Sequence, residues 1–401
     1  MLTTTKALEA VLAEIKTFDT ETISANKAAG RILQQIVQAE RSQPPFNRVM
    51  MDGIALSWND FSDGQLTFPI QAMQAAGDQA LSLQVGHCIE IMTGASLPNN
   101  ADCIVPIEQI HIANGIATIK ADYELKKKSF IHPCGSDFEK GAHLLIPGKR
   151  ISPLDIAIIA SCGKTEVIVA KDPVIRVIST GNELVAAGNA IEAHQIRMSN
   201  GPAIVSLLKS HNYKKTNHDH IIDDISELRN RLAEHLDEAE VIILSGGVSM
   251  GKTDYIPQVL KDLKVKVIFH KVSQRPGKPM WFGRGSKGQM VFALPGNPVS
   301  ALVCCRQYVI AALSSASGAS EGLSELAVIE SDISFKPELT FFLPVKLISN
   351  ISGQVLAMPV KTNTSGDFAS LSATDGYIEL AKNQTHFSAG TAVPLHRWIA
   401  R

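Results

Sequence analysis

The sequence predicts an α/β multidomain protein, and three observations support this fold class. Apolar, strand-like runs alternate with helical stretches from residue 174 to the helix that begins at about Pro298, as in a mostly parallel sheet covered on both faces. Short apolar runs separated by turn residues precede and follow this region, which is typical of small β-rich units. At 401 residues, the chain is also too long for one ordinary hydrophobic core.

Composition and charge exclude several function classes. Hydrophobic residues make up 45% and charged residues 19% of the chain, which are values of a folded globular protein. The net charge of -1 lacks the broad basic field of a nucleic-acid binder. The six cysteines form no CxxC pair, so structural zinc is not expected. Because no signal peptide and no stretch near the roughly twenty apolar residues of a membrane span is present, we expect a cytoplasmic protein without membrane contact.

Hydrophobic spacing and turn signals define the expected elements. Leu8, Val11, Leu12 and Ile15 share one face of a helix expected from residue 7 to 18, and the run after Gly30 is helical or extended. A helix with both ends marked covers residues 152–163. In the central region we expect strands at 174–180, 241–247, 265–270 and 290–296, and helices at 200–211, 225–236 and from about 298. Residues 41–135 should form a small β-rich unit, and the stretch after about 322 a small β-barrel or sandwich.

A glycine-rich loop follows the most apolar strand. In the segment 245–251, SGGVSMG, the glycines let backbone N–H groups approach a phosphate, although a tight strand-to-helix turn is the alternative interpretation. We therefore expect an anion cradle formed by Ser245, Gly246, Gly247 and Ser249. Asp254 stands where its carboxylate can hold a divalent cation against that phosphate, or cap a helix instead.

Three further loops fall where central strands end or turn. Thr180, Gly181 and Glu183 place polar groups and an acid directly after a buried strand, where ligands of parallel sheets bind. A stiff second loop carries two cations suited to an anionic ligand, and it consists of Arg275, Pro276, Gly277 and Lys278. The third loop opens a helix whose free N–H groups can meet an anion, and its candidate residues are Pro295, Gly296, Asn297, Pro298 and Ser300.

The order of these four loops, STGxEL, SGGVSxGxxD, PGKP and PGNPVSA, resembles the molybdopterin-binding domain of molybdenum cofactor biosynthesis. An adenylyltransferase and a molybdenumtransferase share that domain. The flanks favour the transferase, because MDG at 51–53, TGASLP at 93–98, ADCIVPIE at 101–108 and SGDFASL at 365–371 are similar to its other domains. The chain thus resembles the molybdopterin molybdenumtransferase family, which includes MoeA and the gephyrin E-domain, along nearly its whole length.

The resemblance implies a domain division and a reaction. The expected domains are an N-terminal framework domain (1–40 plus 136–170), an inserted β-rich domain (41–135), a molybdopterin-binding α/β domain (171–320) and a small C-terminal β-barrel (321–401). The implied substrates are adenylylated molybdopterin and molybdate, with magnesium as the divalent cation, and the products are molybdenum cofactor and AMP. The implied assembly is a homodimer, and the molybdopterin adenylyltransferase is a candidate partner.

Family position also implies roles for single residues. Asp254, Glu183 and Asp223 would handle the cation or molybdate, and Lys278 with Arg275 would bind anions. Asp52 and Asp137 would reach the catalytic site across the dimer interface.

The sequence departs from the family at several positions. The family carries arginines before a Gly-Glu-Asp turn, whereas this chain has HPCGSD at 132–137. His132 is a pH-dependent substitute for a fixed charge. Arg48 and Arg197 are new cations, and we hypothesise that they compensate. The family's Thr-Gly-Asp-Glu has also become TGNE at 180–183.

Three rival functions remain open: a binding scaffold that has lost turnover, a molybdopterin adenylyltransferase, and a nucleotide-processing hydrolase with the same central domain. A cluster of His218, Asp219, His220, Asp223 and Asp224 also admits a metal site. The alternative is that Asp224 opens the following helix as part of a capping box.

Overall fold

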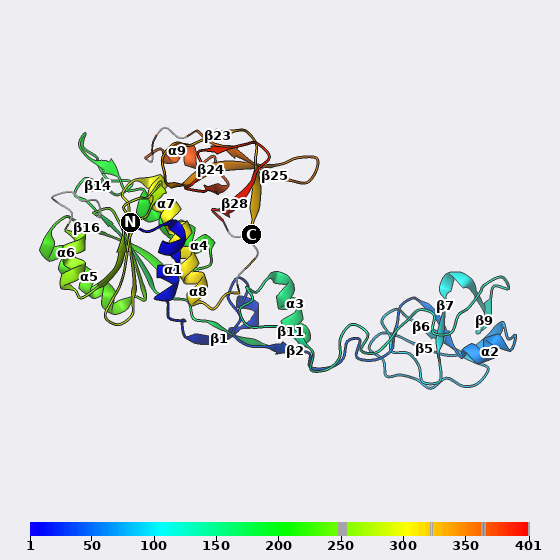
Figure 1. Ribbon diagram of the computed structural model, residues 1–401. Coiled ribbons are helices and arrows are strands. Elements are labelled where there is room, and N and C mark those ends of the chain that lie inside the picture. The colour runs from blue at the N-terminus through cyan, green and yellow to red at the C-terminus, as the bar shows by residue number, and fades with distance from the viewer. Residues whose placement is uncertain (248–254, 321, 323, 362–363, 365, 400–401) are drawn as a thin grey trace.

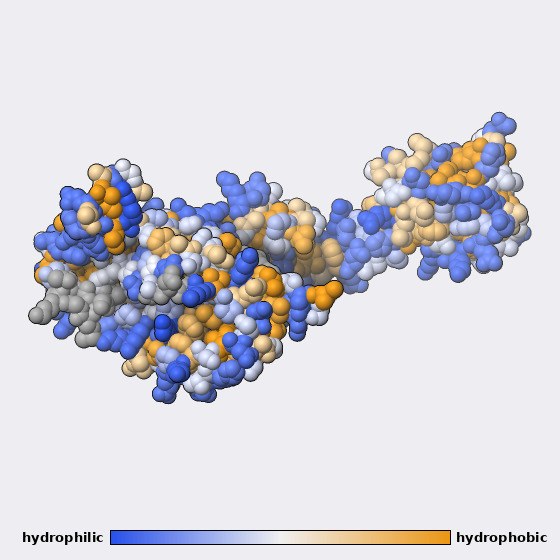
Figure 2. Space-filling model, turned by 90° about the horizontal axis from the view of Figure 1, so that it is seen from above, coloured by the Kyte–Doolittle hydropathy of each residue, from blue (hydrophilic) through white to orange (hydrophobic). Residues whose placement is uncertain are grey.

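The computed structural model describes residues 1–247, 255–320, 322, 324–361, 364 and 366–399. The molecule is elongated, with a main body and a distal lobe joined by a narrow neck through which the chain runs out and back (Figure 1). Figure 2, seen from above, shows the same two bodies and a neck with a largely hydrophilic surface.

A six-stranded sheet forms the centre of the main body. Its strand order is β16-β13-β17-β21-β20-β18. The first four strands are parallel, and β20 runs antiparallel to both of its neighbours. The strands are β13 (Ile175–Thr180), β16 (Thr216–Ile221), β17 (Val241–Ser245), β18 (Lys266–His270), β20 (Trp281–Arg284) and β21 (Met290–Leu294). All five side chains of β17 and all five of β21 are buried, as expected for strands covered on both faces.

Helices cover both faces of this sheet (Figure 1). One face packs against α1 (Thr4–Ala13), α4 (Asn200–Ser210), α7 (Pro298–Cys304), a π-helical turn η3 (Cys305–Val309) and α8 (Ile310–Ala316). The other face packs against α5 (Ile225–Glu238) and α6 (Ile256–Asp262). Two short strands, β14 (Leu184–Val185) and β15 (Ile196–Arg197), pair beyond the end of β13.

The N-terminal framework links the main body to the neck. It contains β1 (Thr20–Ser24), η1 (Ala25–Lys27), β2 (Val37–Gln38), β11 (His143–Leu145), α3 (Pro153–Ser161) and β12 (Glu166–Ala170). Ser152 and Asp155 form a capping box at the start of α3, and the helix lies within the range 152–163 that its end signals predicted. Residues from both sides of the insertion share one core, since Leu33 and Val37 pack with Leu145 and Val169.

The distal lobe contains a mixed six-stranded sheet of order β7-β4-β6-β5-β9-β8. Its elements are β3 (Arg48–Val49), β4 (Gly53–Leu56), α2 (Trp58–Ser62), β5 (Thr67–Gln74), β6 (Cys88–Ile91), β7 (Cys103–Pro106), η2 (Ile107–Gln109), β8 (Ile110–Ala113), β9 (Ile116–Ile119) and β10 (Ile131–His132). The sheet buries an apolar cluster on each face.

The C-terminal region is a small β-barrel. Strands β24, β25, β22, β28 and β26 pair in that order, and β24 also pairs with β26, which closes the ring. A short strand from the main body, β19 (Gln274–Arg275), pairs with β24 outside this ring. The elements of this region, including the five barrel strands, are β22 (Leu326–Ile329), β23 (Ile333–Ser334), β24 (Thr340–Ser349), β25 (Val355–Pro359), α9 (Phe368–Leu371), β26 (Gly376–Leu380), β27 (His386–Phe387) and β28 (Ala392–Arg397).

The α/β multidomain fold class is confirmed, and the four central strands and three helices that the sequence predicted lie where expected. The sequence analysis missed β16, β20 and α6, which belong to the same body. The first helix is shorter than expected and ends at Ala13, and its Ala7 and Val11 pack in the core of the α/β body. The run after Gly30 is extended and not helical. The exact domain boundaries stay a prediction.

One helical run is more apolar than the sequence analysis expected. Within the described residues, the continuous helix Pro298–Ala316 has 19 residues and a mean hydropathy of 1.4, which are the length and composition of a membrane span. However, 72% of it is buried inside the protein. The helix is therefore packed as a core helix, and its cysteines Cys304 and Cys305 are fully buried.

Candidate functional site

A pocket of about 100 Å³ lies where β13, β17 and β21 end. These strands are parallel neighbours, so their carboxyl ends open on one edge of the sheet, where ligands of such sheets bind. The structure brings six of the predicted residues together around this pocket: Thr180, Glu183, Ser245, Gly246, Gly296 and Pro298. Arg197 and Asn200 also line it.

The glycine turn after β17 leaves no room for side chains. Gly246 and Gly247 have φ values of +104° and +63°, which favour glycine. A Cβ at Gly246 would lie 2.9 Å from the Thr180 carbonyl oxygen, and one at Gly247 would lie 2.5 Å from Ile256 Cδ1. Beside them, the buried Thr180 hydroxyl has no hydrogen-bond partner among the described residues. A buried hydroxyl without a partner costs free energy unless a ligand or water satisfies it, so this atom points to a binding site.

The loop after β13 holds Glu183 against Gly181. Gly181 has a φ of +143°, and a Cβ there would lie 2.4 Å from Glu183 Oε2. The next residue, Asn182, accepts a hydrogen bond from the backbone N–H of Asp223 at 3.0 Å. This bond joins the loop that carries Glu183 to the loop that carries Asp223. The two predicted carboxylates therefore belong to neighbouring loops at one edge of the sheet.

Asn200 connects two of the predicted loops, and sequence reasoning did not select it. Its Nδ2 donates to Ser245 Oγ at 2.9 Å and to the Gly296 carbonyl at 2.7 Å. Asn200 begins α4, three residues after Arg197. The sequence signal that could have found it was its position at the start of a predicted helix in the α/β domain.

A second pocket, of about 330 Å³, lies beside the loop that opens α7. It brings together the predicted residues Arg275, Pro276, Gly277, Lys278, Asn297 and Ser300. Gly296 and Pro298 line the first pocket while Asn297 and Ser300 line the second, so the loop 295–300 stands between the two. Arg275 also makes a cation–π contact with Phe335 of the C-terminal region, with its guanidinium carbon 5.9 Å from the ring centroid.

Arg197 is one of the two proposed compensating cations, and part of its guanidinium is hydrogen-bonded to the loop that precedes it. Its Nη1 donates to the carbonyls of Ala186 and Asn189, each at 2.9 Å. Arg197 nevertheless lines the first pocket. Its guanidinium therefore holds the loop between the parallel strands β14 and β15 beside that pocket.

Asp52 directly precedes β4 of the distal lobe, and Asp137 follows β10, where its backbone N–H donates to the Gln43 carbonyl at 2.9 Å. Neither residue lines the two pockets, and the distal lobe lies apart from the main body (Figure 1). Asp52 Oδ1 accepts hydrogen bonds from the hydroxyl and the backbone N–H of Thr93, at 2.7 and 2.6 Å. These bonds lower the pKa of Asp52. Asp137 Oδ1 lies 2.9 Å from His132 Nε2, and His132 Nδ1 lies 2.9 Å from Arg48 Nη2.

The predicted metal ligands are only partly within the structure. Asp254 and the turn residue Ser249 lie outside the described residues. Among those described, no group of three or more His, Cys, Asp or Glu side chains could hold a metal ion. Oxygen ligands suited to a hard cation are nevertheless present in the first pocket, where Glu183, Ser245 and the unpartnered Thr180 hydroxyl converge. These donors fit magnesium provided that a further carboxylate completes the set.

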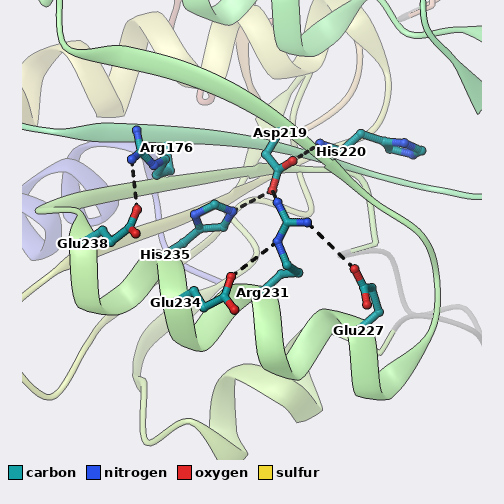
Figure 3. A network of polar contacts seen from close by, with 8 residues as sticks. All are labelled: Arg176, Asp219, His220, Glu227, Arg231, Glu234, His235 and Glu238. Atoms are coloured by element: carbon teal, nitrogen blue, oxygen red, sulfur yellow. Dashed lines mark hydrogen bonds and ion pairs between the residues drawn. The ribbon is translucent and has the colours of Figure 1, made fainter.

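The cluster around His218 is a structural network and not a metal site. Strand alternation turns Asp219 toward α5, where Arg231 at 2.5 Å and His235 at 2.7 Å donate to it (Figure 3). Burial alone would raise the pKa of Asp219, but these two partners hold it below its ordinary value. Asp224 caps α5 by accepting from the Glu227 backbone N–H, which confirms the helix-cap interpretation.

The neighbouring histidines bond to the loop after β13. His218 Nε2 lies 2.9 Å from Ser179 Oγ, and His220 Nε2 lies 2.9 Å from the Gly181 carbonyl oxygen. A carbonyl can only accept, so His220 donates from Nε2. His218 therefore supports the end of β13, and His220 supports the first residue of the loop after it.

Three family models match consecutive parts of the chain. Residues 2–163 match the MoeA N-terminal region (domain I and II), residues 176–315 a probable molybdopterin binding domain, and residues 327–398 the MoeA C-terminal region (domain IV). Together they cover most of the sequence, and their order is that of the framework and distal lobe, the α/β body and the barrel.

Full-length relatives agree with these matches. The chain is 36% identical over 401 residues to a molybdopterin molybdenumtransferase of Synechocystis sp., covering 99% of this chain and 100% of that protein. It is 29% identical to one of Staphylococcus epidermidis, covering 92% and 89%. A crystal structure of the molybdopterin biosynthesis MoeA protein from Pyrococcus horikoshii matches with a TM-score of 0.82 and 28% identity over 100% of both chains. The chain therefore belongs to the MoeA family of molybdopterin molybdenumtransferases.

Proposed function

We propose that this transferase inserts molybdenum from molybdate into adenylylated molybdopterin and releases molybdenum cofactor and AMP. The observation that carries the proposal is the pair of pockets on either side of the loop 295–300. One pocket offers a glycine cradle with an unpartnered hydroxyl, and the other offers two cations. A substrate with an anhydride phosphate needs both, because breaking the anhydride develops charge that must be neutralised.

The residues of the two pockets would bind different parts of the substrate. Lys278 and Arg275 bind anionic oxygens, and their stiff loop limits the entropy lost on binding. The backbone N–H groups of Gly246 and Gly247 would bind the terminal phosphate or the AMP side, together with Ser249, which lies outside the described residues. The loop 295–300 would close over the substrate between the pockets. Asn200 holds this loop beside Ser245, because it donates hydrogen bonds to Ser245 Oγ and to the Gly296 carbonyl.

Magnesium is the proposed cation, and Glu183, Asp254 and Asp223 would hold it with the Thr180 hydroxyl. When bound, it would supply positive charge next to the phosphate oxygens. Gly181 serves this arrangement by leaving space for the Glu183 carboxylate, which a side chain at that position would displace.

A homodimer would complete the site. Asp52 and Asp137 do not line the two pockets of their own chain. If both carboxylates act on the substrate, a second copy of the chain must supply them. We further propose that the enzyme works in the cytoplasm and receives its substrate from the molybdopterin adenylyltransferase.

Purified protein incubated with adenylylated molybdopterin, magnesium and molybdate tests the proposal. We expect AMP release that requires molybdate. A binding scaffold would retain the substrate without releasing AMP. A pterin adenylyltransferase would instead consume ATP with unmodified molybdopterin, and a nucleotide hydrolase would release AMP without any need for molybdate. Each of these three outcomes would overturn the proposed reaction.

A further inference from the structure

A fully buried glutamine, Gln274, forms a hydrogen bond to the cationic loop. Gln274 has no exposed surface, and it directly precedes the loop residues Arg275 to Lys278. Its Nε2 donates to the Pro276 carbonyl oxygen at 3.0 Å and to Cys304 Sγ at 3.3 Å. Its Oε1 accepts a hydrogen bond from the hydroxyl of Tyr308. Both ends of the amide are therefore satisfied inside the protein.

The partners of Gln274 come from the helix that starts at the loop 295–300. Cys304 ends α7, and Tyr308 lies in the π-helical turn Cys305–Val309. A π-helical turn contains an extra residue and is frequent near functional sites. Both side chains are fully buried. The helix that begins between the two pockets therefore also helps to hold the cationic loop. Its Tyr308 donates to Gln274, and Gln274 donates to the Pro276 carbonyl.

The loop packs so closely against Gln274 and Cys304 that Gly277 has no room for a side chain. Gly277 has a φ of +90°, and a Cβ there would lie 2.4 Å from Cys304 Sγ and 2.8 Å from Gln274 Nε2. Main-chain bonds hold the base of the loop, where Val272 N–H donates to the Lys278 carbonyl at 2.9 Å and Met280 N–H to the Gly277 carbonyl at 3.2 Å, and Arg275 pairs with Phe341 of β24. Two side chains hold the middle of the loop: Gln274 donates to the Pro276 carbonyl at 3.0 Å, and Cys304 Sγ donates to the Gly277 carbonyl at 3.7 Å.

We propose that Gln274 is a positioning residue that presets Arg275 and Lys278 for anion binding. An apolar side chain could fill the same volume in a buried site, but it could not donate to the Pro276 carbonyl. Holding both cations in place before the ligand arrives reduces the entropy lost on binding. The inference rests on the proposed function in one respect, because it takes molybdate or the AMP phosphate as the anion.

Three variants separate positioning from simple stability. Gln274→Leu leaves the Tyr308 hydroxyl buried without a partner, which destabilises the fold as well as the loop. The double variant Gln274→Leu/Tyr308→Phe removes that hydroxyl too, so its melting temperature should exceed that of Gln274→Leu. Tyr308→Phe alone keeps the bond to Pro276. The matched control is Gln307→Leu/Tyr377→Phe, because Tyr377 donates to Gln307 at 2.9 Å in a second buried pair, and neither residue lines the second pocket.

In the AMP-release assay, the double variant should need about tenfold more molybdate or substrate for half-maximal rate, with kcat changed much less. Tyr308→Phe should lie between it and the wild type, and the Gln307/Tyr377 control should keep the wild-type half-saturation. A folded Gln274→Leu/Tyr308→Phe protein with normal half-saturation would overturn the proposal.

Hydrogen exchange of the peptide covering residues 274–282 gives a readout that does not depend on the reaction. Exchange should be about tenfold faster in both Gln274 variants than in the wild type or the control. Unchanged exchange would refute the positioning role, whatever the enzyme's substrate. Faster exchange in a protein whose wild type releases no AMP would refute the proposed function and leave the positioning role supported.

Discussion

Nη2 of Arg48 lies 2.9 Å from Nδ1 of His132, across the paired strands β3 and β10. An arginine can only donate, so His132 Nδ1 must accept, and the proton sits on Nε2. Nε2 in turn lies 2.9 Å from Asp137. The chain therefore places a fixed positive charge beside the position where its family resemblance implies arginine, and the imidazole of His132 connects that charge to Asp137.

Arg48 should supply the cation that His132 lacks. We expect Arg48→Ala to raise the molybdate concentration for half-maximal AMP release by about tenfold, roughly 1.4 kcal/mol of binding. Adding His132→Arg to that variant should restore most of the affinity, because it returns a fixed charge to the same strand pair. Molybdate titrations of the single and double variants test this, and an Arg48→Ala protein with unchanged half-saturation would show that the segment lies away from the site.

Gly181 should be needed for the position of Glu183. Alanine there is strained by the positive φ and would push the carboxylate aside, so we expect AMP release to fall at least about tenfold. Gly353→Ala is the matched control, since Gly353 has a φ of +79° with nothing within 4 Å of an added Cβ. Both variants should lose about 1 kcal/mol of stability. Equal activity of the two proteins would remove Gly181 from the account.

Mixed dimers test whether two chains build one site. An Asp52→Ala protein and an Asp254→Ala protein should each be inactive, because each lacks one proposed carboxylate. Unfolded together and refolded, they should recover part of the wild-type rate, since some heterodimers contain one intact site. Activity is compared with each variant refolded alone, and a mixture no more active than its parts argues that both residues act within one chain.

Asp254 itself should act through its charge. Asp254→Asn keeps the shape of the side chain, so adenylylated molybdopterin should still bind while AMP release falls at least about a hundredfold, roughly 2.7 kcal/mol of barrier. A residue that only caps a helix would tolerate Asn, because Asn caps nearly as well. Near-normal AMP release by the folded variant would refute the metal role.

Acid should destabilise the α/β body through Asp219. The pKa of this carboxyl is lowered in the folded protein, so its contribution to stability is complete above the unfolded value of about 3.9 and is lost as pH falls through the folded value. Asp219→Asn should be less stable than the wild type at pH 7 and should lose less stability below about pH 4. Urea denaturation at both pH values measures this, and identical acid profiles would contradict it.

Much of the central body could be predicted from sequence because its signals are local. Apolar runs marked β13, β17 and β21, and Ser152 with Asp155 marked the start of α3. The first helix was predicted too long, because Ile15 and Phe18 pack against the core from a non-helical segment. Helical spacing and such packing place apolar residues in the same way, so the spacing alone could not locate the helix end.

The connections within the site could not be predicted, because they join residues far apart in the chain. Asn200 bonds to Gly296, 96 positions later, and Tyr308 bonds to Gln274, 34 positions earlier. Nothing in the local sequence of either pair indicates its partner. The strand-end loops themselves were recognisable because glycine, proline and charge occur together there, which is a local pattern.

The most direct measurement of the proposed function counts molybdenum and AMP in the same reaction. Protein, adenylylated molybdopterin and magnesium are mixed with or without molybdate, and the AMP released is compared with the molybdenum bound to the pterin product. The account predicts one molybdenum atom inserted for each AMP released, and no more than a slow background release when molybdate is omitted. AMP release without molybdenum insertion, or insertion without AMP release, would contradict it.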